Sequence, residues 1–394
     1  MIPCRSGKLD RFARSDWCGD RHRGTACRCA AVGAAGSCCR RLLLPVAVLA
    51  ATIAGCNDGT AGNGTDNSTP ADRGNDPRLR IVCTVGMVAD IVRRVAGERG
   101  DVVSLMGEGV DPHLYKPTRN DVRTLLSADV VFYNGLLLEG RMTDVLTQVA
   151  RRGVPVYAVT EGIPRDRLRE PPEFQGHYDP HVWMDVSLWK LAMQFAAERL
   201  AELDPTAASD YRRRATEYAV QLDRLDAYVR RVIGSIPARQ RYLVTAHDAF
   251  GYFSLAYDIP VRSVQGITTE SEAGVDDVVR LVDFIVQRRI PAVFVESSVN
   301  PKTVEAIVAG AARRGWTVRI GGTLFSDAMG PRGTYEGTYV GMIDHNATTI
   351  ARALGGEAPQ RGLNGRLSLI RERSSAERGA NASNGGSIGN RTAR

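Results

Sequence analysis

Cysteine is scarce in the greater part of this 394-residue chain. Six of its eight cysteines precede residue 40, and only Cys56 and Cys83 come later. Residues 56–394 therefore cannot contain a framework of several disulfides or a four-thiolate metal site. The six early cysteines would suit a metal or disulfide knot, but we expect them to lie in a leader that is removed or never translated.

Long hydrophobic runs are also missing. The apolar run at residues 42–53 contains 12 residues, which is too short to cross a bilayer but typical of a signal sequence. It follows two arginines and ends in IAGC, which resembles a bacterial lipobox. We therefore predict a leader over residues 1–55 and lipidation of Cys56 as the first residue of the mature protein. Secretion with a free Cys56 is the alternative.

A strong charge of either sign is absent from the central part of the chain. The formal net charge is +7, but residues 1–55 contribute +6 and residues 357–394 contribute +4, which leaves −3 for residues 56–356. A domain that binds nucleic acid usually carries a basic patch, so we exclude nucleic acid as a partner. Hydrophobic residues (43%) and charged residues (24%) occur in the proportions of a globular protein.

Large apolar side chains are nearly absent from residues 57–77 and again from residues 374–394. Such segments cannot bury enough surface to offset the entropy lost on ordering. We predict a lipidated flexible tether over residues 56–78 and a disordered tail over residues 357–394. The lipid should hold the mature protein outside the cytoplasmic membrane, in the periplasm or at the cell surface.

Between these segments, short β-rich runs alternate with helical patterns. Strands are predicted at RIVCTV (80–85), DVVSLM, DVVFYNG and VPVYAV, and a second series is predicted at RYLVTA (241–246), VRSVQG, PAVFVESS and TVRIGG. Strands that alternate with helices of about ten residues predict parallel βαβ units. We therefore predict an α/β fold with two lobes, residues 79–205 and 237–356, each with a parallel sheet.

One long helix is predicted between the lobes. Residues 206–233 contain no glycine or proline, and their apolar side chains recur at an approximately helical period. At about 1.5 Å per residue, these 28 residues would form a rod of roughly 42 Å, too long for a simple crossover. We predict a rigid linking helix over residues 206–236.

Histidine is scarce as well, and its placement is informative. Of six histidines, His22 lies in the leader. His113 and His247 follow predicted strands, as does Asp327, and His181 precedes a predicted helix. Ligands of α/β sheets bind beyond the carboxyl ends of strands, and imidazole is a common ligand of transition metals. These four residues, two from each lobe, are therefore candidates for one site. Taken alone, a loop histidine is more often a surface residue or a partner of a ligand, and an aspartate before a helix is usually its cap.

Several longer motifs add a family resemblance. DPHLYKPT, DPHVWMDV, LVTAHDAFGYFSLAYDI, VQGITTESEAG, PAVFVESSV and GGTLFSDAMG occur in this order between residues 80 and 354. Together they resemble the cluster A-I metal-binding solute-binding proteins of bacterial ABC importers, of the TroA type. The resemblance implies two α/β lobes joined by one long helix, with one divalent metal ion in the cleft between them. It also implies the ion's ligands, which are His113, His181, His247 and Asp327.

The resemblance further implies a function. The chain should be an extracytoplasmic receptor that binds zinc, manganese or both and delivers the ion to the membrane permease of an importer with a cytoplasmic ATPase. We expect a monomer without enzymatic activity. Two alternatives remain: a zinc-dependent hydrolase, because three histidines and one aspartate can also hold a catalytic zinc, and a surface adhesin, because some relatives were first described as adhesins.

The identity of the metal and the roles of two residues stay open. Three imidazoles and one carboxylate suit Zn(II), and a carboxylate that binds through both oxygens would suit Mn(II). Members of the family with glutamate at the position of His247 are typically manganese or iron receptors. Pro180 prevents a helical pairing of His177 with His181, so we expect His177 at the rim of the site. We expect Glu296 to hydrogen-bond a ligating histidine, with direct metal contact as the alternative for both residues.

Overall fold

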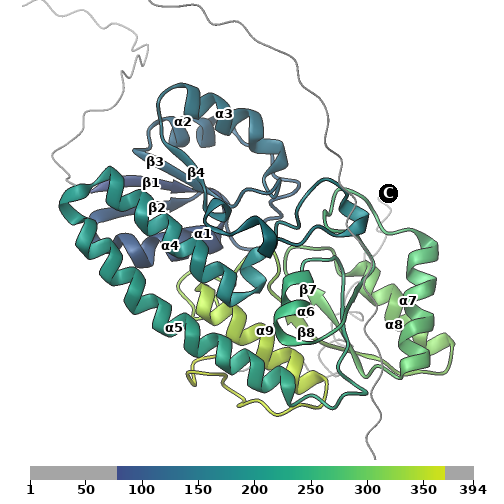
Figure 1. Ribbon diagram of the computed structural model, residues 1–394. Helices are drawn as coiled ribbons and strands as arrows, with labels where there is room; N and C mark the ends of the chain where they lie inside the picture. Colours follow the sequence, from purple (N-terminus) through teal and green to yellow (C-terminus); the bar gives the residue numbers. More distant parts are fainter. Residues whose placement is uncertain (1–77, 369–394) are drawn as a thin grey trace, which may run out of the picture. The chain divides into compact units, whose positions relative to one another are not determined.

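The computed structural model describes residues 78–368, which belong to one compact unit of the chain (Figure 1). Cys56, the predicted leader, most of the predicted tether and residues 369–394 lie outside the described part. Within it, none of the helices has the length and apolar character needed to cross a membrane.

The N-terminal lobe is built on one parallel sheet. Its strands are β1 (Leu79–Cys83), β2 (Gly100–Ser104), β3 (Val130–Tyr133) and β4 (Val156–Ala158), in the order β2-β1-β3-β4. They are connected by α1 (Gly86–Ala96), α2 (Arg119–Leu126) and α3 (Thr143–Arg151). The two central strands, β1 and β3, are mostly buried, as expected for strands covered on both faces. The predicted parallel βαβ units of this lobe are confirmed.

The C-terminal lobe contains two separate pairs of parallel strands. β5 (Leu243–Thr245) pairs with β6 (Val261–Ser263), and β7 (Ala292–Glu296) pairs with β8 (Arg319–Leu324). The helices of this lobe are α6 (Gly251–Tyr257), α7 (Val275–Arg288), α8 (Lys302–Arg313) and α9 (Tyr339–Ala353). Parallel α/β architecture is confirmed here too, but the strands β5 and β6 are only three residues long, and β5 lies next to β7 without a continuous ladder.

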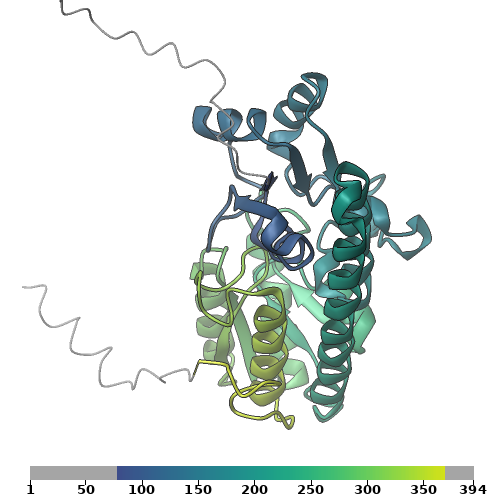
Figure 2. The same ribbon diagram turned by 90° about the vertical axis from the view of Figure 1, so that its left-hand side faces the viewer.

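Two long helices follow the first sheet in the sequence: α4 (Val186–Leu203), which belongs to the N-terminal lobe, and α5 (Ala208–Gly234), which links the two lobes. The second contains 27 residues, which at about 1.5 Å each make a rod of about 40 Å. Tyr218 in α5 donates a hydrogen bond to Asp90 in α1, whereas Tyr228, further along α5, is hydrogen-bonded to Thr348 in α9. The linking helix therefore spans both lobes, as predicted, and Figure 2 shows α5 running beside α9.

Short 3₁₀ helices complete the described elements, at Gly97–Arg99, Gly140–Met142, Val159–Gly162, Arg165–Arg167, Pro172–Phe174, Val182–Met184 and Pro205–Ala207. Four of these lie between β4 and α4, where the chain forms a long loop. This loop carries the segment that contains His181, so its attachment to the rest of the protein determines where that histidine lies.

The largest hydrophobic core is shared by the two lobes. It combines buried side chains of the first sheet, α1, α4 and α5 with those of α6, α9, β7 and β8. A smaller core lies under α7 and α8. The shared core is reinforced by Tyr339, whose hydroxyl donates to the carbonyl of Trp183 at 2.7 Å. Burial of this much common apolar surface opposes separation of the lobes.

The ordered chain continues beyond residue 356, where the sequence predicts the disordered tail to begin. Leu367 is buried, and the backbone N–H of Leu363 donates to both carboxylate oxygens of Asp344 at 2.9 Å. The N–H of Ser368 donates to Glu336 at 2.6 Å. Residues 357–368 therefore pack against the C-terminal lobe, because two buried carboxylates need these donors and the side chain of Leu367 is buried.

Candidate metal centre

Four loops bring the candidate ligands to one place. His113 lies between β2 and α2, and His181 immediately precedes the 3₁₀ helix Val182–Met184 that leads into α4. His247 follows β5 and Asp327 follows β8. His247 and Asp327 thus lie just beyond the carboxyl ends of parallel strands, as expected for a site of this fold, whereas His113 lies in a longer loop and His181 at the start of a helix.

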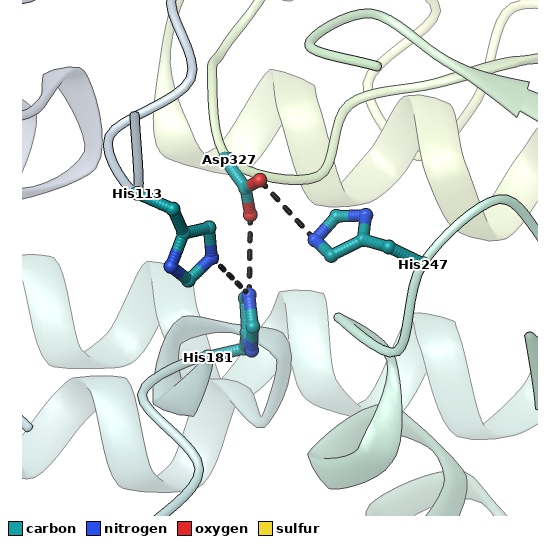
Figure 3. A group of neighbouring side chains, drawn as sticks. All are labelled: His113, His181, His247 and Asp327. Carbon is teal, nitrogen blue, oxygen red and sulfur yellow. Dashed lines mark hydrogen bonds and ion pairs between the residues drawn. The ribbon is translucent and has the colours of Figure 1, made fainter. Parts of the chain in front are cut away.

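The four side chains point toward one another (Figure 3), and one ligand atom from each lies within 4.8 Å of all the others. Nε2 of His181 is 3.3 Å from Nε2 of His113 and 3.3 Å from Oδ1 of Asp327. Nε2 of His247 is 3.2 Å from Oδ2 of Asp327. The cluster therefore converges on a single point.

These separations match the geometry of a bound transition metal. A tetrahedral ion with bonds of about 2.1 Å holds its ligand atoms about 3.4 Å apart. Three of the contacts, at 3.2–3.3 Å, are close to this separation, and one ligand atom from each residue lies within 4.8 Å of the others. The three imidazoles and the carboxylate could therefore hold one divalent ion between them.

Burial of the four polar side chains has a free-energy cost that a bound cation would reduce. His181 and His247 are fully buried, and His113 and Asp327 are 3% and 2% exposed. Within residues 78–368, Nε2 of His247 and Oδ1 of Asp327 are buried atoms that make ion-pair contacts in the cluster but no aligned hydrogen bond. Buried polar groups are normally satisfied, so these two atoms indicate a position where a ligand belongs.

Two Asp-Pro-His segments position the first pair of histidines. The backbone N–H of His113 donates to Asp111 at 2.9 Å, and the N–H of His181 donates to Asp179 at 3.0 Å. Each aspartate thereby forms a turn that places the histidine two residues later. After the second turn, Asp185 caps α4 by accepting hydrogen bonds from its first N–H groups, which starts the helix directly behind the site.

Carboxylates hold the outer nitrogens of two imidazoles. Oδ1 of Asp179 lies 2.7 Å from Nδ1 of His181, and Oε2 of Glu296 lies 2.6 Å from Nδ1 of His247, the latter as an ion-pair contact without hydrogen-bond alignment. The other oxygen of Glu296 accepts from the N–H groups of Ala246 and His247 at 2.8 and 2.9 Å. Carboxylates in this position fix the ring so that Nε2 faces the metal.

The charged groups of the cluster shift one another's pKa values. Burial would raise the pKa of Asp327, but the neighbouring His247 and His181 hold that pKa well below its usual range. Burial opposes protonation of His181, yet Asp179 and Asp327 raise its pKa to about 9. His247 behaves similarly, because Glu296 and Asp327 outweigh burial and raise its pKa well above the usual value. For His113, burial dominates and lowers the pKa to about 3.

The remaining histidines of the described part lie outside the cluster. His177 is exposed, with its ring 5.2 Å from that of Phe174. Nε2 of His345 is 2.9 Å from the carbonyl oxygen of Thr323. Glu296 approaches the site only through His247.

Sequence reasoning missed the role of Asp179. The signal was present, because Asp-Pro-His occurs twice and a carboxylate two residues before a histidine can reach its Nδ1. It also missed Arg169, whose Nη1 donates to Asp179 at 2.6 Å. No local pattern marks that arginine, because its partners lie 10 and 79 residues further along the chain.

Two α/β lobes that share one long helix and enclose a buried cluster of three histidines and one aspartate define a metal-binding solute-binding protein. Residues 81–353 match the family described as zinc-uptake complex component A, periplasmic (ZnuA). The chain belongs to this family, which confirms the resemblance seen in the motifs.

Individual relatives agree with this assignment. The manganese-binding lipoprotein MntA of Bacillus subtilis (strain 168) is 45% identical over 311 residues, 79% of this chain and 98% of MntA. The zinc-binding protein TroA of Treponema pallidum (strain Nichols) is 49% identical over 285 residues, 72% of this chain and 91% of TroA. The solved structure of the periplasmic zinc-binding protein TroA from Treponema pallidum matches with a TM-score of 0.68 and 48% identity, and covers 70% of this chain and 99% of that one.

Proposed function

We propose that this protein is an extracytoplasmic receptor that binds one divalent transition metal ion, zinc or manganese, as cargo. It delivers the ion to the membrane permease of an ABC importer, which a cytoplasmic ATPase drives. The observation that carries this proposal is the buried convergence of three imidazole nitrogens and one carboxylate within 4.8 Å. Membership of a zinc-uptake family supports the transport role.

The proposed ligands are His113, His181 and His247, each through Nε2, and Asp327 through one or both oxygens. This donor set suits Zn(II) as a tetrahedral ion and suits Mn(II) if the carboxylate binds through both oxygens. One similar relative is named for manganese and another for zinc, which supports a site that accepts both. By the usual order of affinities, zinc should bind more tightly than manganese.

Transport fits the donor set better than catalysis. Catalytic zinc usually has three protein ligands and keeps a position open for water or substrate. Here four protein side chains would complete a tetrahedral shell, and their exposure of 3% or less leaves little access for a substrate. We therefore propose that the protein has no hydrolase activity.

We also propose an arrangement of the whole chain. Residues 1–55 are a leader, Cys56 carries the lipid anchor, and residues 56–78 are the tether outside the cytoplasmic membrane. The N-terminal lobe (79–205), the linking helix (206–236) and the C-terminal lobe, which extends from residue 237 to about 368, act as a monomer. Cys56→Ala should release the protein from the membrane fraction or leave an unprocessed precursor, and an unchanged membrane fraction would contradict the anchor.

The metal assignment is tested by competitive titration of zinc and manganese into the wild-type protein and His247→Glu. Replacing a nitrogen donor with an oxygen donor should weaken zinc binding and improve manganese binding relative to zinc. An unchanged ratio of the two affinities would show that His247 is not a ligand. Deletion of the gene should impair growth in metal-depleted medium, and restoration by added metal would separate uptake from adhesion.

A further inference from the structure

Arg169 lies behind the histidine cluster, on the side of Asp179 away from the metal position. One oxygen of Asp179 faces Nδ1 of His181 at 2.7 Å, and the other accepts from Nη1 of Arg169 at 2.6 Å. Asp179 is fully buried. Its negative charge is thus shared between the imidazole and the guanidinium.

The same guanidinium reaches the other lobe. Nη1 and Nη2 of Arg169 are both 3.3 Å from Oδ2 of Asp248, the residue that directly follows His247. Arg169 belongs to the loop before α4 in the N-terminal lobe, and Asp248 follows β5 in the C-terminal lobe. One planar side chain therefore connects carboxylates adjacent to a candidate ligand from each lobe, which a guanidinium can do because its donors form a rigid fork.

The surrounding structure is shaped to hold Arg169 in this position. A Cβ atom at Gly251, the first residue of α6, would lie 2.1 Å from Nη1 of Arg169, so the guanidinium rests directly on the glycine. The hydroxyl of Tyr252 accepts from the backbone N–H of Arg169 at 2.9 Å and donates to the carbonyl of Asp179 at 3.0 Å. Both ends of the loop segment 169–179 are thereby attached to the C-terminal lobe.

We propose that Arg169 is a positioning residue that fixes His181 and His247 relative to each other across the two lobes and thereby slows release of the metal. This inference deepens the proposed function and rests on it. Parting the lobes to free the ion would break the Arg169–Asp248 contact, so the contact opposes release. Without Arg169, two neighbouring carboxylates would lose their shared counterion, and Asp179 would no longer be held against His181.

Arg169 also links the enclosed site to solvent. The candidate ligands are at most 3% exposed, whereas the side chain of Arg169 is 23% exposed. Arg169 and Asp248 line a surface hollow of about 580 Å³ together with residues of α6 and β6. The hydrogen-bonded chain from the metal position through His181 and Asp179 therefore ends at a residue that solvent can reach.

The test is zinc release from the full-length protein into excess chelator, followed by stopped flow, together with the zinc dissociation constant. Outer partners of metal ligands typically contribute 10–100-fold to affinity, so Arg169→Met should release zinc about 10–100-fold faster. Arg169→Lys keeps the charge, but one ammonium lacks the fork, so release should still be about 10-fold faster while the metal-free melting temperature stays near that of the wild type.

Gly251→Ala tests the geometry without changing any charge. The added methyl group displaces the guanidinium, so zinc release should be faster than in the wild type, as in Arg169→Lys. The visible absorption bands of the cobalt-loaded protein, which report ligand geometry, should shift in Arg169→Met and Gly251→Ala. The matched controls are Arg167→Met and Gly234→Ala. Arg167 lies in the same loop, is exposed and donates to the hydroxyl of Ser187 at 3.4 Å, and a Cβ at Gly234 would meet no atom within 4 Å.

Wild-type release rates and cobalt spectra in Arg169→Lys and Gly251→Ala would overturn the inference and leave the proposed function intact. An equal acceleration in Arg167→Met would also overturn it, because the effect would then be general to the loop. A wild-type protein that binds no zinc or manganese would instead refute the proposed function itself.

Discussion

The two Asp-Pro-His segments begin alike and end differently. In both, the aspartate accepts the backbone N–H of the histidine two residues later, at 2.9 Å for Asp111 and 3.0 Å for Asp179. Asp179 then contacts its own histidine at Nδ1, whereas Asp111 accepts a hydrogen bond from the hydroxyl of Thr269 in the other lobe. The same three-residue sequence therefore places His181 in a charged network, whereas the pKa of His113 is determined mainly by burial.

The difference appears in the charge of the two imidazoles. Burial lowers the pKa of His113 to about 3, so this ring is neutral across the physiological range. Asp179 and Asp327 overcome burial at His181 and raise its pKa to about 9. An identical local sequence thus gives a neutral histidine or a cationic one, depending on which carboxylates the tertiary structure brings to it.

Removing either histidine should have the largest effect. His113→Ala and His181→Ala each delete a proposed ligand, so zinc affinity should fall by more than about 100-fold, beyond the usual effect of outer partners. His181→Ala should also lower the metal-free melting temperature more, because it leaves the buried Asp179 without its imidazole partner. Competition with a chromophoric chelator and calorimetric melting measure the two effects.

The exposed His177 supplies the control for this comparison, and His177→Ala should bind zinc like the wild type. Wild-type affinity in either His113→Ala or His181→Ala would remove that histidine from the site.

Replacing the aspartate of each Asp-Pro-His segment with asparagine should reduce zinc affinity to different extents in the two segments. Asp179→Asn removes the charge that orients His181, so zinc affinity should fall about 10–100-fold. Asp111→Asn keeps an oxygen that can accept the N–H of His113, so the loss should be no more than a few-fold. Equal losses for the two variants, measured by competitive titration, would show that both aspartates act in the same way.

The pH dependence should come from His181 and His247 and not from His113. Both have raised pKa values without metal, and binding requires neutral imidazole, so close to two protons should be released per ion at pH 7. Affinity should therefore keep rising from pH 7 to about 9. Titration calorimetry in buffers of different ionisation enthalpy counts the protons, and release of fewer than one proton at pH 7 would contradict the assignment.

The metal-free protein should show the opposite trend in stability. Because the folded pKa of His181 lies above its unfolded value of about 6.5, its contribution is fully present below pH 6.5 and is lost as pH rises to about 9. The lowered pKa of His113 acts at the other end, where stability is lost as pH falls from about 6.5 toward 3. Melting temperatures of metal-free protein across this range measure both effects.

The smallest effect on zinc affinity and stability is expected for Thr269, the hydrogen-bond partner of Asp111. Thr269→Val removes the hydroxyl that donates to this carboxylate, and loss of one such hydrogen bond typically costs about 1 kcal/mol. The melting temperature should fall by a few degrees, with zinc affinity within a few-fold of the wild type. A loss of affinity as large as that of Asp179→Asn would mean that the first segment is also held through its carboxylate.

Much of the fold was predictable because its determinants are local. Periodic apolar patterns predicted the alternating strands and helices, and an uninterrupted helical pattern predicted α5. The division of the C-terminal strands into two pairs was not predictable, since it depends on contacts between β5 and β7 that no local pattern encodes. The packing of Leu367 was missed for the same reason, because its neighbours come from distant parts of the chain.

The candidate site likewise has residues that the sequence predicts and residues that it does not. The four proposed ligands follow from the motifs, and their role in binding metal stays a prediction. Glu296 was expected beside a ligating histidine and lies against His247. Asp179 had a detectable signal in the repeated Asp-Pro-His, but Arg169 did not, because its function depends on meeting Asp248 and Gly251 across the two lobes.

The central claim is that His113, His181, His247 and Asp327 together bind one divalent metal ion. Anomalous diffraction from crystals of the zinc-loaded protein, recorded on both sides of the zinc absorption edge, tests it most directly. We predict one strong peak about 2.0–2.2 Å from Nε2 of each histidine and from the Asp327 carboxylate. A peak at another position, or one that any of these four side chains fails to reach, would contradict the account.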